Sequence, residues 1–192
     1  MKETMGYFDT DEGVDEYIEM AEGYDGRELI ETLRSYIPSG SSVLELGMGP
    51  GKDLALLEPY FWATGSDGSA VFIDRYRALE SSADVLVLDA VNIDTERRFD
   101  AIYSNKVMQH LSKRDARRSL TAQHRALNPG GIALHSLWFG DKLEQHHGLL
   151  FQQYTAESFS ELLDEQFEVL ESKSYAEMEA GDSLCVVLKR LD

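Results

Sequence analysis

The residues with the clearest chemical potential form the pattern Glu45-x-Gly47-x-Gly49-x-Gly51. Residues 43–46 are apolar apart from the glutamate and predict a buried strand, and the residues after Gly51 predict a helix. Glycines between a strand and a helix let the backbone approach a ligand, and the free N–H groups at the helix start point toward it. The pattern predicts a ligand-binding loop, although a plain tight turn has a similar composition.

The spacing of the glycines argues against two common phosphate-binding loops. In the dinucleotide fingerprint G-x-G-x-x-G, Lys52 stands where the third glycine belongs. In the P-loop G-x-x-x-x-G-K-[ST], Leu46 and Asp53 occupy the first and last positions. The identity of the ligand therefore depends on residues elsewhere in the chain.

Acidic and amide side chains end the next predicted strands. Asp67 ends the strand 63–67 and lies 20 residues beyond Gly47. An acid at that place accepts hydrogen bonds from both hydroxyls of a ribose, whereas the alternative is an ordinary turn or helix-capping aspartate. Asp89 follows the predicted strand 84–88, and Asn105 ends the strand 99–105.

The order of elements predicts how these residues come together. Five alternations of strand and helix precede a C-terminal hairpin, which consists of residues 167–171 and 183–189. This order predicts a doubly wound α/β sheet in one domain, mostly parallel with one antiparallel strand near the C-terminal edge. A ligand then binds beyond the carboxyl ends of the strands. We expect a helix over 112–127, a tight turn at 128–131 and a loop over 139–153.

These motifs resemble those of the class I S-adenosylmethionine-dependent methyltransferases over roughly residues 40–190. The resemblance rests on the glycine motif, Asp67, Asp89-Ala90 and the segment from Tyr103 to Leu111, together with the turn Asn128-Pro129-Gly130-Gly131. The segment 103–111 and the turn 128–131 are similar to those of the small-molecule branch of the superfamily (methyltransferase type 11/12). The resemblance implies a Rossmann-like seven-stranded sheet, S-adenosylmethionine as cofactor, and in-line methyl transfer to a small-molecule acceptor.

Individual roles follow from the same resemblance. Asp89 and the backbone of Ala90 are expected to contact the adenine, as the corresponding family residues do. Gln109 departs from the histidine that is common at its position in that branch. The cofactor-binding residues that we expect are Tyr24, Arg27, Glu45, Gly47, Met48, Gly49, Asp67, Gly68, Asp89, Ala90, Ser104 and Asn105.

Three histidines are candidates for a general base. A base is needed only when the acceptor carries a proton at neutral pH, and histidine titrates in the useful range. His110, His146 and His147 are the candidates, and each also suits a loop or packing position. We expect no metal, because the vicinal pair lacks further ligands at a regular spacing.

The N-terminal residues 1–38 are expected to form a helical lid over the domain of residues 39–192. Residues 1–31 contain eleven acids, yet Val14, Tyr17 and Ile18 form part of an apolar helical stripe. The lid hypothesis places Tyr24 or Arg27 at the ligand. The alternative is an acidic helix that only packs on the flank of the sheet.

Composition limits the class of protein and partner. The 192 residues carry a formal net charge of −17, which disfavours a nucleic-acid substrate and weakly favours a neutral or cationic one. No apolar run is long enough to span a membrane, and no signal peptide is evident, so we expect a cytoplasmic protein. The single cysteine, Cys185, lies in an apolar run and is expected to be a buried, inert thiol.

Two other functions compete with methyl transfer. A nicotinamide-dependent oxidoreductase is disfavoured by Lys52 and Asp89. A non-catalytic S-adenosylmethionine-binding partner or regulator remains open, with helix 112–127 or the acidic N-terminus as its contact surface. Turnover of the cofactor with an acceptor separates catalysis from regulation. The oligomeric state and the acceptor atom are not set by the sequence.

Overall fold

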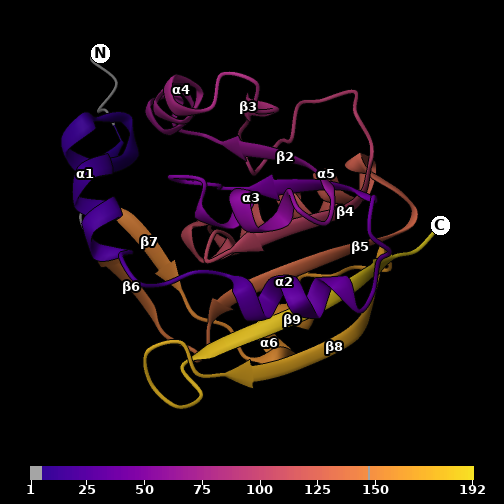
Figure 1. Cartoon of the computed structure of the whole chain (residues 1–192). Coiled ribbons are helices and arrows are strands. Elements are labelled where there is room, and N and C mark those ends of the chain that lie inside the picture. The colour runs from indigo at the N-terminus through magenta and orange to yellow at the C-terminus, as the bar shows by residue number, and fades with distance from the viewer. Residues whose placement is uncertain (1–5, 147) are drawn as a thin grey trace.

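The computed structural model describes residues 6–146 and 148–192, which surround a central seven-stranded sheet (Figure 1). The strands of this sheet are β1 (Ser42–Leu46), β2 (Trp62–Asp67), β3 (Val85–Val87), β4 (Phe99–Asn105), β5 (Leu127–Trp138), β8 (Phe167–Tyr175) and β9 (Ser183–Arg190). Their order is β3-β2-β1-β4-β5-β9-β8, and β9 runs antiparallel to both of its neighbours while the other pairs are parallel. The predicted sheet and its reversed strand are confirmed.

Helices cover both faces of the sheet. They are α1 (Asp11–Met20), α2 (Arg27–Arg34), α3 (Lys52–Leu57), α4 (Ala70–Leu79), α5 (Lys113–Ala126) and α6 (Ala156–Ser160), with the 3-10 turns η1 (Tyr7–Asp9) and η2 (Met108–His110). On one face α2 and α3 bury Leu33 and Leu57 against the sheet, and α5 and α6 bury Leu120 and Phe159 on the other. Cys185 of β9 is buried in the first of these layers, and burial raises the pKa of its thiol to about 12.

Side-chain caps fix the starts of α1, α4, α5 and α6, whereas α2 and α3 begin after glycines. The Ser112 hydroxyl accepts the backbone N–H of Asp115 at 3.1 Å, so α5 begins where the sequence predicts. At α6, Thr155 and Ser158 form a reciprocal capping box, in which serine replaces the usual acid. The Ser69 hydroxyl caps α4 and thereby fixes the turn that follows Asp67.

The expectation of a loop over 139–153 is wrong. This stretch contains a second, two-stranded sheet, formed by β6 (Leu143–His146) and β7 (Leu149–Gln152). All described β6 side chains are exposed, so this strand buries no face and leaves no alternating apolar pattern in the sequence. In Figure 1 the hairpin lies beside α1, at the side of the sheet where the predicted ligand site is.

Two other local expectations need correction. Strand β5 begins at Leu127, and residues 128–131, expected as a separate tight turn, stand opposite Asp100 alone as an irregularity in the pairing with β4. Gly130 has φ +71° within this irregularity. The connection 88–98 between β3 and β4 contains turns but no helix, so one of the five expected strand-helix alternations is absent from the described chain.

Candidate functional site

A cavity of about 280 Å³ lies at the carboxyl edge of the sheet, between the core domain and the N-terminal segment. Its walls come from five regions of the chain: the N-terminal segment, the glycine loop, the end of β4 with η2, the hairpin β6–β7 with the end of β5, and the loop between β8 and β9. The lining residues of the first three are Tyr7, Phe8, Tyr17, Met20, Ala21, Tyr24, Asp25, Glu45, Gly47, Met48, Pro50, Lys52, Asp53, Asn105, Lys106, Gln109 and His110. Trp138, Leu149, Phe151, Glu177 and Met178 complete the walls.

The glycine loop is shaped by close backbone contacts. Gly47 has φ +69°, and a β-carbon there would lie 2.4 Å from a methyl group of Val107. Gly51 has φ +85° at the start of α3, and a β-carbon there would meet the Tyr76 ring at 2.1 Å. Larger residues at these two positions would push the loop away from the sheet edge, so the motif serves close approach as well as turning.

Glu45 provides a buried polar group at the cavity. The residue is 2% exposed, and its Oε2 atom accepts no hydrogen bond from the described residues. Burial, reinforced by the negative charges of Asp53 and Asp67, raises the pKa of Glu45 well above its usual range. An unpaired carboxyl oxygen in this position fits a ligand that brings its own hydrogen-bond donor or positive charge.

Asp67 ties the second strand to the glycine loop. Its carboxylate accepts the backbone N–H of Gly49 at 2.9 Å and that of Ser69 at 2.8 Å. Burial raises the pKa of Asp67, against the opposing effect of these two hydrogen bonds. Asp67 thus has the turn-forming role that the sequence leaves as one alternative. These bonds do not exclude ribose binding, which stays a prediction.

Asp53 connects the N-terminal segment with the sheet. Its carboxylate accepts the backbone N–H of Gly26 at 2.7 Å, the Tyr103 hydroxyl at 2.7 Å and the Asn105 amide at 3.0 Å. A β-carbon at Gly26 would lie 2.0 Å from the Tyr103 oxygen and 2.3 Å from Asp53. The start of α2 therefore sits directly on this buried acid.

The N-terminal segment forms the outer wall of the cavity. Tyr17 packs on the glycine loop, because a β-carbon at Gly49 would lie 3.4 Å from its ring. Phe8 meets Tyr17 edge to face with centroids 5.4 Å apart. Burial, with the nearby carboxylates of Asp67 and Asp53, raises the pKa of Tyr17 to about 12, so its hydroxyl stays protonated.

His110 also lines the cavity, and its ring meets that of Phe8 edge to face with centroids 6.5 Å apart. Its Nδ1 atom lies 2.8 Å from the carbonyl oxygen of Leu150 in β7. A carbonyl only accepts, so Nδ1 carries the proton and Nε2 keeps its lone pair. The ring also packs edge to face on Phe151, with centroids 4.8 Å apart. Burial lowers the pKa of His110, against the opposing effect of the Leu150 contact.

The structure brings about half of the expected site residues to the cavity. Tyr24, Glu45, Gly47, Met48, Asn105 and His110 line it, and Gly49 and Asp67 adjoin it through their hydrogen bond. Gly68 is exposed, with open space around its Cα. Asp89 is exposed, and its carboxylate accepts the Val91 N–H and the Asn92 amide at 2.8 and 2.7 Å.

Other expected residues point elsewhere. The Arg27 side chain is 68% exposed and pairs with Asp25. Contrary to the expectation, it does not reach into the cavity. Ser104 is buried on the other side of β4, where its hydroxyl contacts His135 Nδ1 at 2.7 Å. The Ala90 carbonyl accepts the Ser119 hydroxyl.

Of the two remaining histidine candidates, the structure describes only His146. His146 is exposed on β6, 3.7 Å from Glu144, and does not line the cavity. His147 lies outside the described residues.

Sequence reasoning missed several cavity residues. Phe8, Trp138, Phe151 and Glu177 belong to no recognised motif, and Lys106 lies in the motif 103–111 without a role expected for it. Tyr17 had a signal in the apolar stripe of the first helix, although that stripe did not reveal its contact with the glycine loop. Across the described ranges no group of three or more His, Cys, Asp or Glu side chains is placed to hold a metal ion.

The sheet order, the glycine loop and the strand-end carboxylates define a class I S-adenosylmethionine-dependent methyltransferase, which is an enzyme with S-adenosylmethionine as cofactor. A family model described as a methyltransferase domain matches residues 17–176, and the chain belongs to this family. None of the helices in residues 6–146 and 148–192 is long and apolar enough to span a membrane.

Two tRNA methyltransferases are similar in sequence to about half of the chain. The chain is 35% identical over 108 residues to a tRNA (carboxymethyluridine(34)-5-O)-methyltransferase of Arabidopsis thaliana, and the match covers 55% of this chain but 26% of that protein. A protein of the same name from Saccharomyces cerevisiae is 35% identical over 104 residues, covering 53% of this chain and 37% of its own length. The chain therefore aligns with well under half of each of these relatives.

Solved structures share the fold. The 1,6-didemethyltoxoflavin-N1-methyltransferase of Burkholderia thailandensis, solved with bound 1,6-didemethyltoxoflavin and S-adenosylhomocysteine, has a TM-score of 0.78 at 22% identity. The match covers 93% of this chain and 83% of that one. A chain from the complex of the Haloferax volcanii Trm112 methyltransferase activator has a TM-score of 0.79 at 17% identity and covers 99% of this chain and 100% of that one.

Proposed function

We propose that this protein transfers a methyl group from S-adenosylmethionine to a hydroxyl or amine of a small-molecule acceptor, with His110 as general base. The observation that carries the proposal is the fixed tautomer of His110 on the cavity wall. Because burial lowers its pKa, the neutral ring predominates at pH 7, and its unprotonated Nε2 can take a proton.

The remaining residues bind, orient and exclude water. Glu45, the glycine loop and Asp67 are the groups that would hold the cofactor, which supplies a methyl group already activated on a sulfonium. Phe8, Tyr17 and Phe151 make the cavity largely apolar, so few waters compete with the acceptor. Alignment of an acceptor in such a site contributes several kcal/mol to catalysis, roughly the scale of other intramolecular orientation effects.

We also propose a lid over the cavity, but one that is shorter than the expected range of residues 1–38. Helix α2 buries Leu29, Ile30 and Leu33 against the sheet and is part of the core. The segment before it is held over the cavity by polar contacts, including Lys52 Nζ on the Ala21 carbonyl at 2.7 Å. We propose that the part of the chain before residue 26 is the cover.

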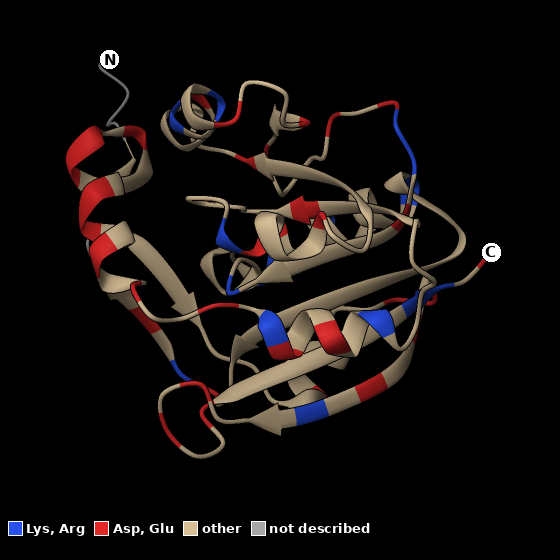
Figure 2. Cartoon of the chain, in the orientation of Figure 1, with Lys and Arg blue, Asp and Glu red and all other residues tan. Residues whose placement is uncertain are grey.

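A tRNA acceptor is the second candidate, and the names of the curated relatives favour it. Helix α5 offers exposed cations, with Arg114 82% and Arg118 54% exposed. Helix α1 of the outer wall is acidic instead: it is largely red in Figure 2, and its Asp and Glu residues are all exposed. Exposed acids on this wall repel a polyanion, so the small-molecule acceptor agrees better with the local charge.

Formation of S-adenosylhomocysteine tests the proposal. Panels of small hydroxyl and amine acceptors and total tRNA are incubated with the enzyme and S-adenosylmethionine at several pH values. We expect turnover with a small acceptor, falling as the pH drops through the His110 pKa because the protonated ring cannot accept a proton.

Substitution of the histidines provides the controls. His110→Asn should lower turnover by about 10²–10⁴-fold and remove the acidic limb of the pH profile while S-adenosylhomocysteine still binds. His146→Asn, a change of the same kind on exposed β6, should leave turnover unchanged. Turnover with tRNA and with no small acceptor would show that the acceptor is tRNA. An unchanged turnover rate in His110→Asn would refute the role of His110 as general base. No product with any acceptor would favour a non-catalytic regulator.

A further inference from the structure

The loop between β8 and β9, residues 176–182, has more internal order than its exposure suggests. Most of its residues are exposed, yet Glu177 and Met178 line the cavity. The Asp182 carboxylate accepts three backbone N–H groups of this loop, from Glu177 at 3.0 Å, Met178 at 2.9 Å and Glu179 at 2.8 Å. Burial opposes ionisation of Asp182, but these bonds outweigh it and lower its pKa to about 2.

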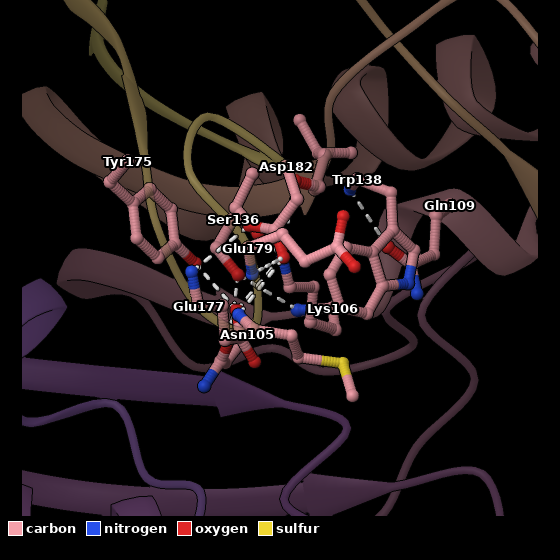
Figure 3. A network of polar contacts seen from close by, with 12 residues as sticks. Asn105, Lys106, Gln109, Ser136, Trp138, Tyr175, Glu177, Glu179 and Asp182 are labelled. Carbon is pink, nitrogen blue, oxygen red and sulfur yellow. Dashed lines mark hydrogen bonds and ion pairs between the residues drawn. The ribbon is translucent and has the colours of Figure 1, made fainter.

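Lys106 fixes this loop from the side of the sheet (Figure 3). Its Nζ contacts the Leu137 carbonyl at 3.2 Å, the Ser183 hydroxyl at 2.6 Å and Glu177 Oε2 at 2.9 Å. It also lies 3.8 Å from the centroid of the Trp138 ring. Lys106 has φ +59°, which is an unfavourable backbone conformation for a residue with a side chain. The ammonium is therefore committed to holding the loop and is not free to bind an anion.

Glu177 is the acidic side chain that Lys106 holds at the cavity. Its Oε2 atom accepts from Lys106 and from the Tyr175 hydroxyl at 3.0 Å, whereas its Oε1 atom accepts no bond from the described residues. The carboxylate also borders a second cavity of about 310 Å³, which shares Tyr24, Asp25 and Asn105 with the first. Glu177 thus stands where the two cavities adjoin.

We propose that Glu177 determines acceptor specificity by accepting a hydrogen bond from an N–H or O–H group of the acceptor, and that Lys106 is its positioning residue. The inference rests on the proposed function of the cavity. A carboxylate held in place selects acceptors with a donor or a positive charge and repels those with a carboxylate or phosphate. The acceptor class is therefore a neutral or cationic hydroxyl or amine compound.

Calorimetry on the full chain saturated with S-adenosylhomocysteine tests the proposal without turnover. Three probes share a phenol ring and differ in charge: tyramine, 4-methylphenol and 4-hydroxyphenylacetate. We expect affinity to fall in that order. Glu177→Gln should weaken tyramine by about 10- to 100-fold relative to 4-hydroxyphenylacetate, the range of a hydrogen bond to a charged group. Glu179→Gln makes the same charge change in the same loop outside the cavity lining and should preserve the order.

The Lys106→Met variant distinguishes two effects of Lys106: it holds Glu177 in place, and it adds a positive charge near the acceptor. Loss of the cation alone would strengthen the preference for tyramine, since the site becomes more negative. Loss of positioning weakens that preference, and this is the result we expect. Unchanged affinity for S-adenosylhomocysteine in both variants verifies that the cofactor site is intact.

Several results would overturn the assignment. These are equal affinity of the wild type for the three probes, no measurable binding of any of them, or an unchanged order in Glu177→Gln. A stronger tyramine preference in Lys106→Met would overturn the positioning role. An intact probe order in an enzyme that methylates no acceptor would instead refute the proposed function and leave the specificity assignment standing.

Discussion

Replacement of Asp67 by alanine should damage both the cofactor site and the fold. The sequence alone predicts a ribose-binding acid whose loss leaves the fold intact. In the structure the carboxylate also accepts the N–H groups of Gly49 and Ser69, at 2.9 and 2.8 Å. Alanine leaves both donors without this partner and removes one tie between the glycine loop and β2, while the Met48 N–H on the Ser66 carbonyl remains.

The magnitude follows from these two contacts. Each hydrogen bond to a charged group contributes about 1.5–3 kcal/mol, but burial of Asp67 raises its pKa and so offsets part of that gain. We therefore expect the free energy of unfolding to fall by about 2–4 kcal/mol. Affinity for S-adenosylhomocysteine should fall by a further factor of about 10–100, corresponding to the lost bonds to ribose.

Urea denaturation and calorimetry with S-adenosylhomocysteine measure the two effects separately. Asp67→Asn keeps one carbonyl oxygen and should give an intermediate result. Asp74→Ala removes an acid that is 75% exposed on α4 and should change stability by less than about 1 kcal/mol. A destabilised Asp67→Ala protein with normal affinity would refute the ribose role, and unchanged stability would refute the loop role.

Two further predictions concern the cover and a buried histidine. Truncation before Asp25 removes Phe8, Tyr17 and the fully buried Val14 while α2 remains, so we expect cooperative urea unfolding and much weaker binding of S-adenosylhomocysteine in calorimetry. An unfolded product or unchanged affinity would rule out the cover. Burial lowers the pKa of His135 from 6.5 to about 4, so as the pH falls through this window the unfolded chain binds a proton before the folded one does. Stability should fall by about 3 kcal/mol more in the wild type than in His135→Asn between pH 6.5 and 4, and parallel pH curves of unfolding free energy would contradict this.

The sheet was predictable because its strands leave strong patterns. Buried parallel strands are continuous apolar runs, and each is followed by a helix or turn signal. The hairpin β6–β7 left no such pattern, since β6 is wholly exposed and is ordered by pairing with β7. The irregularity at 128–131 has the composition of a turn, and only the pairing of β4 with β5 places it inside a strand.

The part of the candidate site that lies at the strand ends was predictable, because the sheet topology determines where these ends meet. Parallel strands bring their carboxyl ends to one edge, which is why Glu45, Asp67 and Asn105 lie near one another. Ser104 and Asn105 were both expected there, although adjacent strand residues face opposite sides. Asn105 faces the cavity and Ser104 contacts His135, so the period of the strand already excluded one of them.

The cavity wall depends instead on contacts between distant segments, and these contacts carry the argument about the acceptor. The cations beside the two cavities in the described structure are engaged: Lys52 with the Ala21 carbonyl, Lys106 with Glu177, and Arg27 with Asp25. Composition alone gives the acidic balance but not these pairings. The charges of Lys106 and Arg27 are thereby balanced by carboxylates, whereas Lys52 rests on a neutral carbonyl. These two ion pairs support the proposal of a neutral or cationic acceptor.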